Sequence, residues 1–111
     1  MAEQSILVFS TFPDAETARR IARIIVEEKL AACVNIIPKI ESIYHWQGKI
    51  EESSEVMALI KSTHWKYQLL EARIRELHPY KVPEIISVRI DSGHVEYLRW
   101  VEQSVIEPRK P

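Results

Sequence analysis

The spacing of hydrophobic residues takes three forms in the first half of this chain, and each form predicts a different element. A continuous apolar run within residues 5–10 is too short for a helix, so it predicts a strand buried on both faces. Residues 14–28 repeat apolar side chains at intervals of three and four, which predicts an amphipathic helix capped by Asp14. Residues 32–46 alternate as in a long strand, and Pro38 predicts an edge position or a bulge because proline donates no ladder hydrogen bond.

The second half of the chain repeats these spacings after a tight turn at Gly48. Of the return strand, only residues 56–60 are apolar at every position, so only this part is expected at the centre of a sheet. Ser62 and Thr63 are suited to cap a second helix. That helix is expected to end at His78, because the proline that follows disfavours helical conformation in the residue before it.

The predicted elements follow the order strand, helix, strand, strand, helix, strand, helix. Residues 86–90 alternate as the last strand, and a short amphipathic helix follows Gly93. This order is the split βαβ, or ferredoxin-like, pattern of an α+β fold. That pattern places its first and third strands in the middle of the sheet, and these are the two strands with continuous apolar runs. We therefore expect a single domain over residues 1–111, with residues 107–111 as a frayed tail.

The two middle strands are residues 32–46 and 49–62. Each is at least about twice as long as the usual strand of roughly 5–6 residues. Their hairpin is therefore expected to extend beyond its own domain. Period-two alternation places one set of side chains on a single face of the first of these strands: Val34, Ile36, Ile40, Tyr44 and Trp46. Apolar groups near the tip exceed what a small core can cover, so we infer a homo-oligomer in which other copies cover them. The alternative is an ordinary monomer whose long strands break at Pro38 and again near Ser53 and Ser54, leaving a flexible loop.

Composition limits the classes of function. Lys+Arg 15 against Asp+Glu 16 gives a net charge of -1, which provides no strong cationic field for nucleic acid or an anionic membrane. The apolar runs fall far short of the roughly 20 residues that span a bilayer. With Gly 2, the common glycine-rich phosphate loops are excluded. The single cysteine, Cys33, forms no intrachain disulfide, and without a secretory signal at the start we expect a cytoplasmic protein.

Candidate chemistry concentrates in residues 78–84, His-Pro-Tyr-Lys-Val-Pro-Glu. Two prolines stiffen this segment and it displays four kinds of polar group, which suits a binding loop, although it could equally be a turn that only redirects the chain. Lys61 and Glu55 share a strand face by parity, so they could form an ion pair, contact a ligand, or leave the lysine extended to solvent. The four histidines lack metal-site spacing within one element, and no motif ties a nucleophile to a base, so no enzyme is expected.

Three blocks of the sequence resemble the CutA family of divalent-cation tolerance proteins. The blocks are residues 30–38, LAACVNIIP; residues 42–52, SIYHWQGKIEE; and residues 78–84, HPYKVPE. The resemblance implies a domain similar in architecture to the PII signalling proteins, in a tight homotrimer whose long hairpins pair between subunits. It also implies a non-enzymatic role linked to binding or tolerance of divalent metals such as copper.

The resemblance further implies a ligand-binding cleft between subunits, lined by Trp46, Glu55, Lys61, His78, Tyr80, Lys81 and Glu84. In members of the family with a proposed copper site, the resemblance implies that the ligands are a cysteine on the first strand and two adjacent histidines. At the matching positions this chain has Ser10, Leu77 and His78. Because only one imidazole ligand, His78, remains, we expect copper or zinc to bind weakly, through His78 with carboxylates such as Glu84 or Glu55 of a neighbouring chain. The alternative is a PII-like sensor or adaptor whose cleft takes a small anionic ligand through Lys61, Lys81 and His78.

Overall fold

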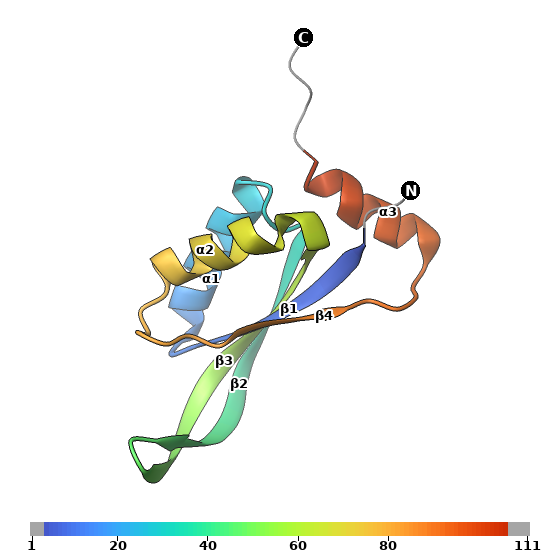
Figure 1. Cartoon of the computed structure of the whole chain (residues 1–111). Helices are drawn as coiled ribbons and strands as arrows, with labels where there is room; N and C mark the ends of the chain where they lie inside the picture. Colours follow the sequence, from blue (N-terminus) through green and yellow to red (C-terminus); the bar gives the residue numbers. More distant parts are fainter. Residues whose placement is uncertain (1–3, 107–111) are drawn as a thin grey trace.

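The computed structural model describes residues 4–106 and contains one four-stranded sheet with two helices packed together over one face and a third helix near one end (Figure 1). Its elements are β1 (Ser5–Phe12), α1 (Ala15–Glu27), β2 (Cys33–Trp46), β3 (Lys49–Thr63), the short 3₁₀ helix η1 (His64–Lys66), α2 (Tyr67–Leu77), β4 (Ile85–Arg89) and α3 (Val95–Ser104). The strands lie in the order β2-β3-β1-β4, and all neighbours are antiparallel. The predicted ferredoxin-like α+β fold is confirmed, with β1 and β3 at the centre. The predicted frayed tail, residues 107–111, lies outside the described residues.

The hydrophobic core lies between one face of the sheet and the helices α1 and α2. The even-numbered residues of β1 face this layer, and Ile6, Val8 and Phe12 are buried there. Helix α2 contributes Leu70 and Ile74, which are 0% exposed. Because successive strand residues point to opposite faces, the helices cover every second residue of β1 and β3.

The opposite side of the sheet, here called the open face, has no helix over most of its length. It carries the half-buried Phe9 of β1 and the exposed Ile86 and Val88 of β4. Helix α3 contacts β1 and β3 near one end, where Ser5 and Thr63 are buried (Figure 1). The prediction that β1 is buried on both faces holds for most of the strand even in one chain, since no residue of β1 is exposed, but Leu7 and Phe9 on the open face are only half-buried.

The hairpin of β2 and β3 extends well beyond the helices (Figure 1). It gives the molecule a longest dimension of 53 Å and a radius of gyration of 15.0 Å, against about 13 Å for a compact domain of roughly 100 residues. The ladder shifts register between Ile37 and Ile40, around Pro38, and β2 is an edge strand. Both outcomes that the sequence offered for Pro38, an edge position and a bulge, are thus present.

The bulge corrects the predicted faces of β2. Val34 pairs with Ile60 and faces the helices, whereas beyond the bulge Ile40 pairs with Glu55, which lies on the open face. An extra residue at a bulge shifts the alternation of all later side chains by one position. Trp46 therefore lies on the side opposite to Val34. The prediction that all five apolar residues share one face is wrong, because simple alternation does not count the bulge.

The two helix starts differ in how well the sequence predicted them. The carboxylate of Asp14 accepts a hydrogen bond of 2.7 Å from the Thr17 amide, which confirms the predicted cap of α1 and lowers the pKa of Asp14. Ser62 and Thr63 instead remain in β3, where Thr63 pairs with Ser5, and η1 separates them from α2. Pairing with β1 thus extends β3 through the predicted cap of α2.

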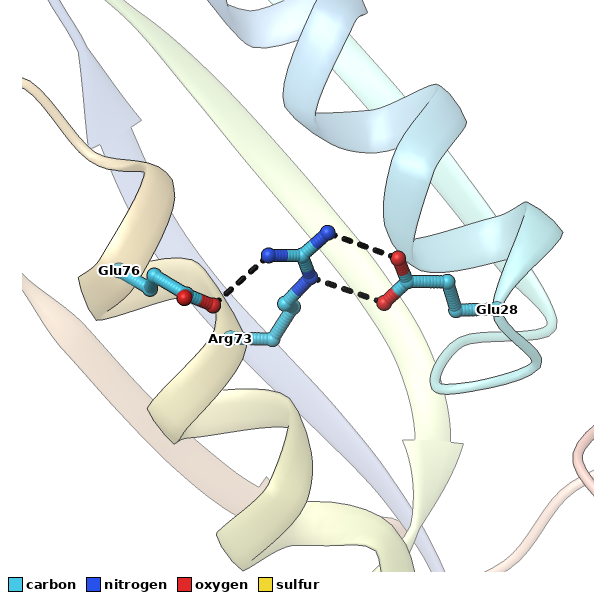
Figure 2. A network of polar contacts seen from close by, with 3 residues as sticks. All are labelled: Glu28, Arg73 and Glu76. Atoms are coloured by element: carbon cyan, nitrogen blue, oxygen red, sulfur yellow. Dashed lines mark hydrogen bonds and ion pairs between the residues drawn. The ribbon is translucent and has the colours of Figure 1, made fainter.

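Arg73 joins α1 to α2 across the outer side of the helix layer (Figure 2). Its Nε and Nη2 donate to the two carboxylate oxygens of Glu28 at 2.9 and 2.8 Å, and its Nη1 donates to Glu76 at 2.7 Å. The guanidinium lowers the pKa of Glu28 through these hydrogen bonds. Such partly exposed pairs contribute little stability, so we assign this bridge to fixing how the two helices lie together.

Candidate functional site

A polar cluster close to the end of β1 brings together Glu55, His78 and Tyr80. His78 ends α2 because Pro79 follows it, and its backbone is extended, with φ -72° and ψ 136°. The loop then turns Tyr80 towards β3, where its hydroxyl donates a hydrogen bond of 2.8 Å to the Glu55 carboxylate. Glu55 is only 9% exposed, although it lies where the hairpin leaves the core. The structure thus places the Glu55 carboxylate within hydrogen-bond distance of the Tyr80 phenol, at the base of the hairpin.

The His78 ring is held on every side. It is 8% exposed and stacks on Phe12, with ring centroids 4.7 Å apart and an interplanar angle of 17°. Its Nε2 lies 2.7 Å from the Thr11 carbonyl oxygen, and its Nδ1 accepts a hydrogen bond of 3.1 Å from the Tyr80 amide. Both ring nitrogens are therefore engaged with the backbone.

Burial sets the charge states of the cluster. It lowers the pKa of His78, although the Thr11 carbonyl and the Glu55 carboxylate act in the opposite direction. Burial, followed by the hydrogen bond to Glu55, raises the pKa of Tyr80. At neutral pH the imidazole is therefore uncharged and the phenol keeps its proton, which it donates to Glu55.

Trp46 and Lys61 do not reach this cluster within one chain. Lys61 is six positions from Glu55 on β3, which corresponds to about 20 Å at the usual rise per strand residue, and its ammonium group donates to the side-chain oxygen of Asn35. Trp46 lies in the opposite direction, beside the hairpin turn, where it pairs with Lys49. A cleft that includes Trp46, Lys61 and Glu55 therefore requires a second chain.

The remaining predicted residues, Lys81 and Glu84, are exposed in the loop after Tyr80. Sequence reasoning missed two partners. Asn35 could have been found, because the same alternation that pairs β2 with β3 places it on the face of Lys61. The contact of Thr11 with His78 uses a backbone carbonyl, so residue types carry no signal for it.

The residues of one chain do not fit a resident metal ion. Within residues 4–106 no group of three or more His, Cys, Asp or Glu is placed to hold one. At the positions of the family's proposed copper ligands, Ser10 is fully buried with a hydroxyl that has no hydrogen-bond partner, and Leu77 has no donor atom. The assignment of His78 as a metal ligand stays a prediction, and it requires the ring to give up a backbone partner.

The unpartnered hydroxyl of Ser10 leads to a stability prediction. A buried polar group without a hydrogen bond costs about 1–3 kcal/mol, so Ser10→Ala is expected to raise the free energy of unfolding by about 1 kcal/mol. Chemical denaturation at one fixed chain concentration measures this. Ser62→Ala is the matched control, because the Ser62 hydroxyl donates to the Leu30 carbonyl at 2.7 Å and its loss should destabilise the fold. A clear loss of stability in Ser10→Ala would contradict the prediction.

Comparisons with known proteins agree with this fold. Residues 6–104 match the family model described as CutA1 divalent ion tolerance protein. The chain is 47% identical over 98 residues to the divalent-cation tolerance protein CutA of Thermus thermophilus, a match that covers 88% of this chain and 95% of that protein. The solved CutA1 structure from Oryza sativa superposes with a TM-score of 0.92 at 40% identity, over 96% of this chain and 98% of that one. The chain belongs to the CutA1 divalent ion tolerance family.

Relatives differ in length and in the compartment that their names give. The human protein CutA is 48% identical over 95 residues, and the match covers 86% of this chain but 53% of the human protein. The Oryza sativa relative is named chloroplastic, and a solved relative from Archaeoglobus fulgidus is described as periplasmic. In the part of this chain that the structure describes, no helix combines the length and apolar character that a membrane crossing requires.

Proposed function

We propose that the chain forms a homotrimer in which neighbouring copies cover the open face and the overhanging hairpin. The observation that carries this proposal is the apolar character of the open face, on which Ile37, Ile86 and Val88 are exposed in one chain. Contiguous exposed apolar surface on a small protein marks an interface. The overhanging hairpin supports the same conclusion, because a ribbon of two strands is marginally stable in water.

Within this trimer we propose a cytoplasmic, non-enzymatic role in divalent-cation tolerance, with copper or zinc held weakly as exchangeable cargo. Glu55 supports this role: its carboxylate is buried, its hydrogen-bond donor is the neutral Tyr80 hydroxyl, and no ion pair within residues 4–106 supplies it with a cation. A buried carboxylate without a compensating positive charge is costly, so binding of a cation stabilises it.

A PII-like sensor of a small anion is the second candidate. Lys61 favours it, because the ammonium group of this half-buried residue contacts a neutral amide oxygen of Asn35 rather than a carboxylate. Together with Lys81 in the loop after Tyr80, Lys61 would provide the positive charge that binds an anionic ligand. This candidate predicts stabilisation by ligand in the absence of metal.

The cation proposal predicts that Glu55→Gln lowers zinc affinity at least about tenfold, since even outer-shell partners of a metal contribute that much. Calorimetric titration of the trimer with zinc(II), repeated with copper(II), measures the change. Glu52→Gln is the matched control, because Glu52 is an exposed carboxylate on the same strand. Equal affinities in Glu55→Gln and the unchanged protein would refute the site. Thermal stabilisation by nucleotides or organic acids in excess chelator would favour the anion sensor instead.

A further inference from the structure

The contacts of His78 define which of its nitrogens carries the proton. The Thr11 carbonyl can only accept a hydrogen bond, so Nε2, 2.7 Å away, must donate to it. The Tyr80 amide can only donate, so Nδ1, 3.1 Å away, must accept. The neutral ring is therefore the Nε2–H tautomer, and its one in-plane lone pair is already shared with the Tyr80 amide.

This arrangement leaves a metal ion little access to the ring. Phe12 covers one side at 4.7 Å between ring centroids, and the Tyr80 ring lies 4.8 Å away at 45°. The ring is 8% exposed. An ion would have to displace the Tyr80 amide from Nδ1 and leave that partly buried donor without its hydrogen bond.

The same contacts connect the loop to the centre of the sheet. Thr11 pairs with Met57 between the two central strands, so its carbonyl is a fixed anchor. His78 bridges this anchor to the Tyr80 amide, and the Tyr80 hydroxyl reaches Glu55 at 2.8 Å. We infer that His78 is a positioning residue, not a metal ligand: it holds the Tyr80 phenol against the Glu55 carboxylate. The inference rests on the proposed function only where it takes Glu55 as the carboxylate that meets the cation.

The first test is a long-range proton–nitrogen NMR correlation of the histidine rings in the unchanged protein, before and after one equivalent of zinc(II). We expect His78 as the Nε2–H tautomer with ring nitrogen shifts that zinc leaves unchanged. The exposed rings of His45 and His64 provide internal references in the same spectrum. An unprotonated Nε2, or His78 nitrogen shifts that move with zinc, would overturn the inference.

The second test is a double-mutant cycle on zinc affinity with His78→Phe and Tyr80→Phe. Phenylalanine keeps the stack on Phe12 but removes both hydrogen bonds of the imidazole. Each single change is expected to lower affinity about 10–100-fold, as loss of an outer-shell partner does, and the double change should cost no more than one of them. Losses that multiply would show that His78 acts independently of Tyr80, and the inference would fail.

Failure of the proposed function remains separable from failure of this inference. If zinc does not bind the unchanged protein, the cation role of Glu55 fails, but the tautomer measurement still decides the role of His78. Hydrogen exchange of the Tyr80 amide adds a metal-free readout, because this amide should exchange at least about tenfold faster in His78→Phe once its acceptor is lost. Unchanged exchange of that amide would contradict a positioning role.

Discussion

Ile86→Glu is expected to convert the proposed trimer into monomers. Ile86 lies on the open face and is 54% exposed in one chain, so the substitution leaves the core between the sheet and α1 and α2 unchanged. In the proposed trimer this position is covered, and an unpaired buried carboxylate costs on the order of 3–5 kcal/mol for each chain. Native mass spectrometry at micromolar concentration measures the outcome, with the unchanged protein expected at three times the 13.0 kDa chain mass.

The matched control is Leu69→Glu. Leu69 is 60% exposed on α2, so it offers the same change of chemistry on the helix side of the molecule, away from the open face. We expect Leu69→Glu to remain trimeric. The interface assignment would be refuted by a trimer that survives Ile86→Glu, and equally by a monomeric unchanged protein.

Leu70→Ala is expected to cause a large loss of stability. Leu70 is 0% exposed between the sheet and α1, and truncation of such a leucine costs about 2–5 kcal/mol, because the cavity collapses only partly. Urea unfolding followed by circular dichroism, at one fixed chain concentration, measures the free energy of unfolding.

Leu69→Ala provides the control for this prediction, because the same truncation one residue earlier removes an exposed side chain. Its effect should lie within about 0.5 kcal/mol of zero, as for most surface changes. Equal losses at Leu69 and Leu70 would mean that the substitution acts through helix formation, and the packing of α2 described above would then be wrong.

Hydrophobic spacing was sufficient to predict the element order and the central strands, because a central strand is apolar at every position while an edge strand alternates. It was not sufficient where tertiary pairing overrides local preference. Thr63 has the chemistry of a helix cap, yet its pairing with Ser5 keeps it in β3. Phe9 belongs to an apolar run that predicted burial on both faces, but on the open face it is only half-buried in one chain. In the proposed trimer, other copies of the chain would cover the rest of its surface.

The candidate site was predictable in part. The two prolines around Tyr80 drew attention to the loop, and in the structure this loop approaches Glu55 of the same chain. The arrangement of His78 was not predictable, because its two hydrogen bonds go to backbone groups whose position depends on the fold. Within one chain the structure also separates Lys61 from Glu55, which share a strand face by parity but lie too far apart to meet.

Because of the bulge between Ile37 and Ile40, the number of residues in β2 determines which side chains lie on each face of the hairpin. Deletion of one residue there would leave the strand almost the same in length and residue types. It would, however, move Tyr44 and Trp46 to the other face of the hairpin. The side chains before the bulge, in the half of β2 that packs under the helices, would stay on the same faces. In the proposed trimer, contact with the neighbouring copies would therefore depend on this one extra residue, and its deletion would turn the contacting side chains away while the core of the domain stays unchanged.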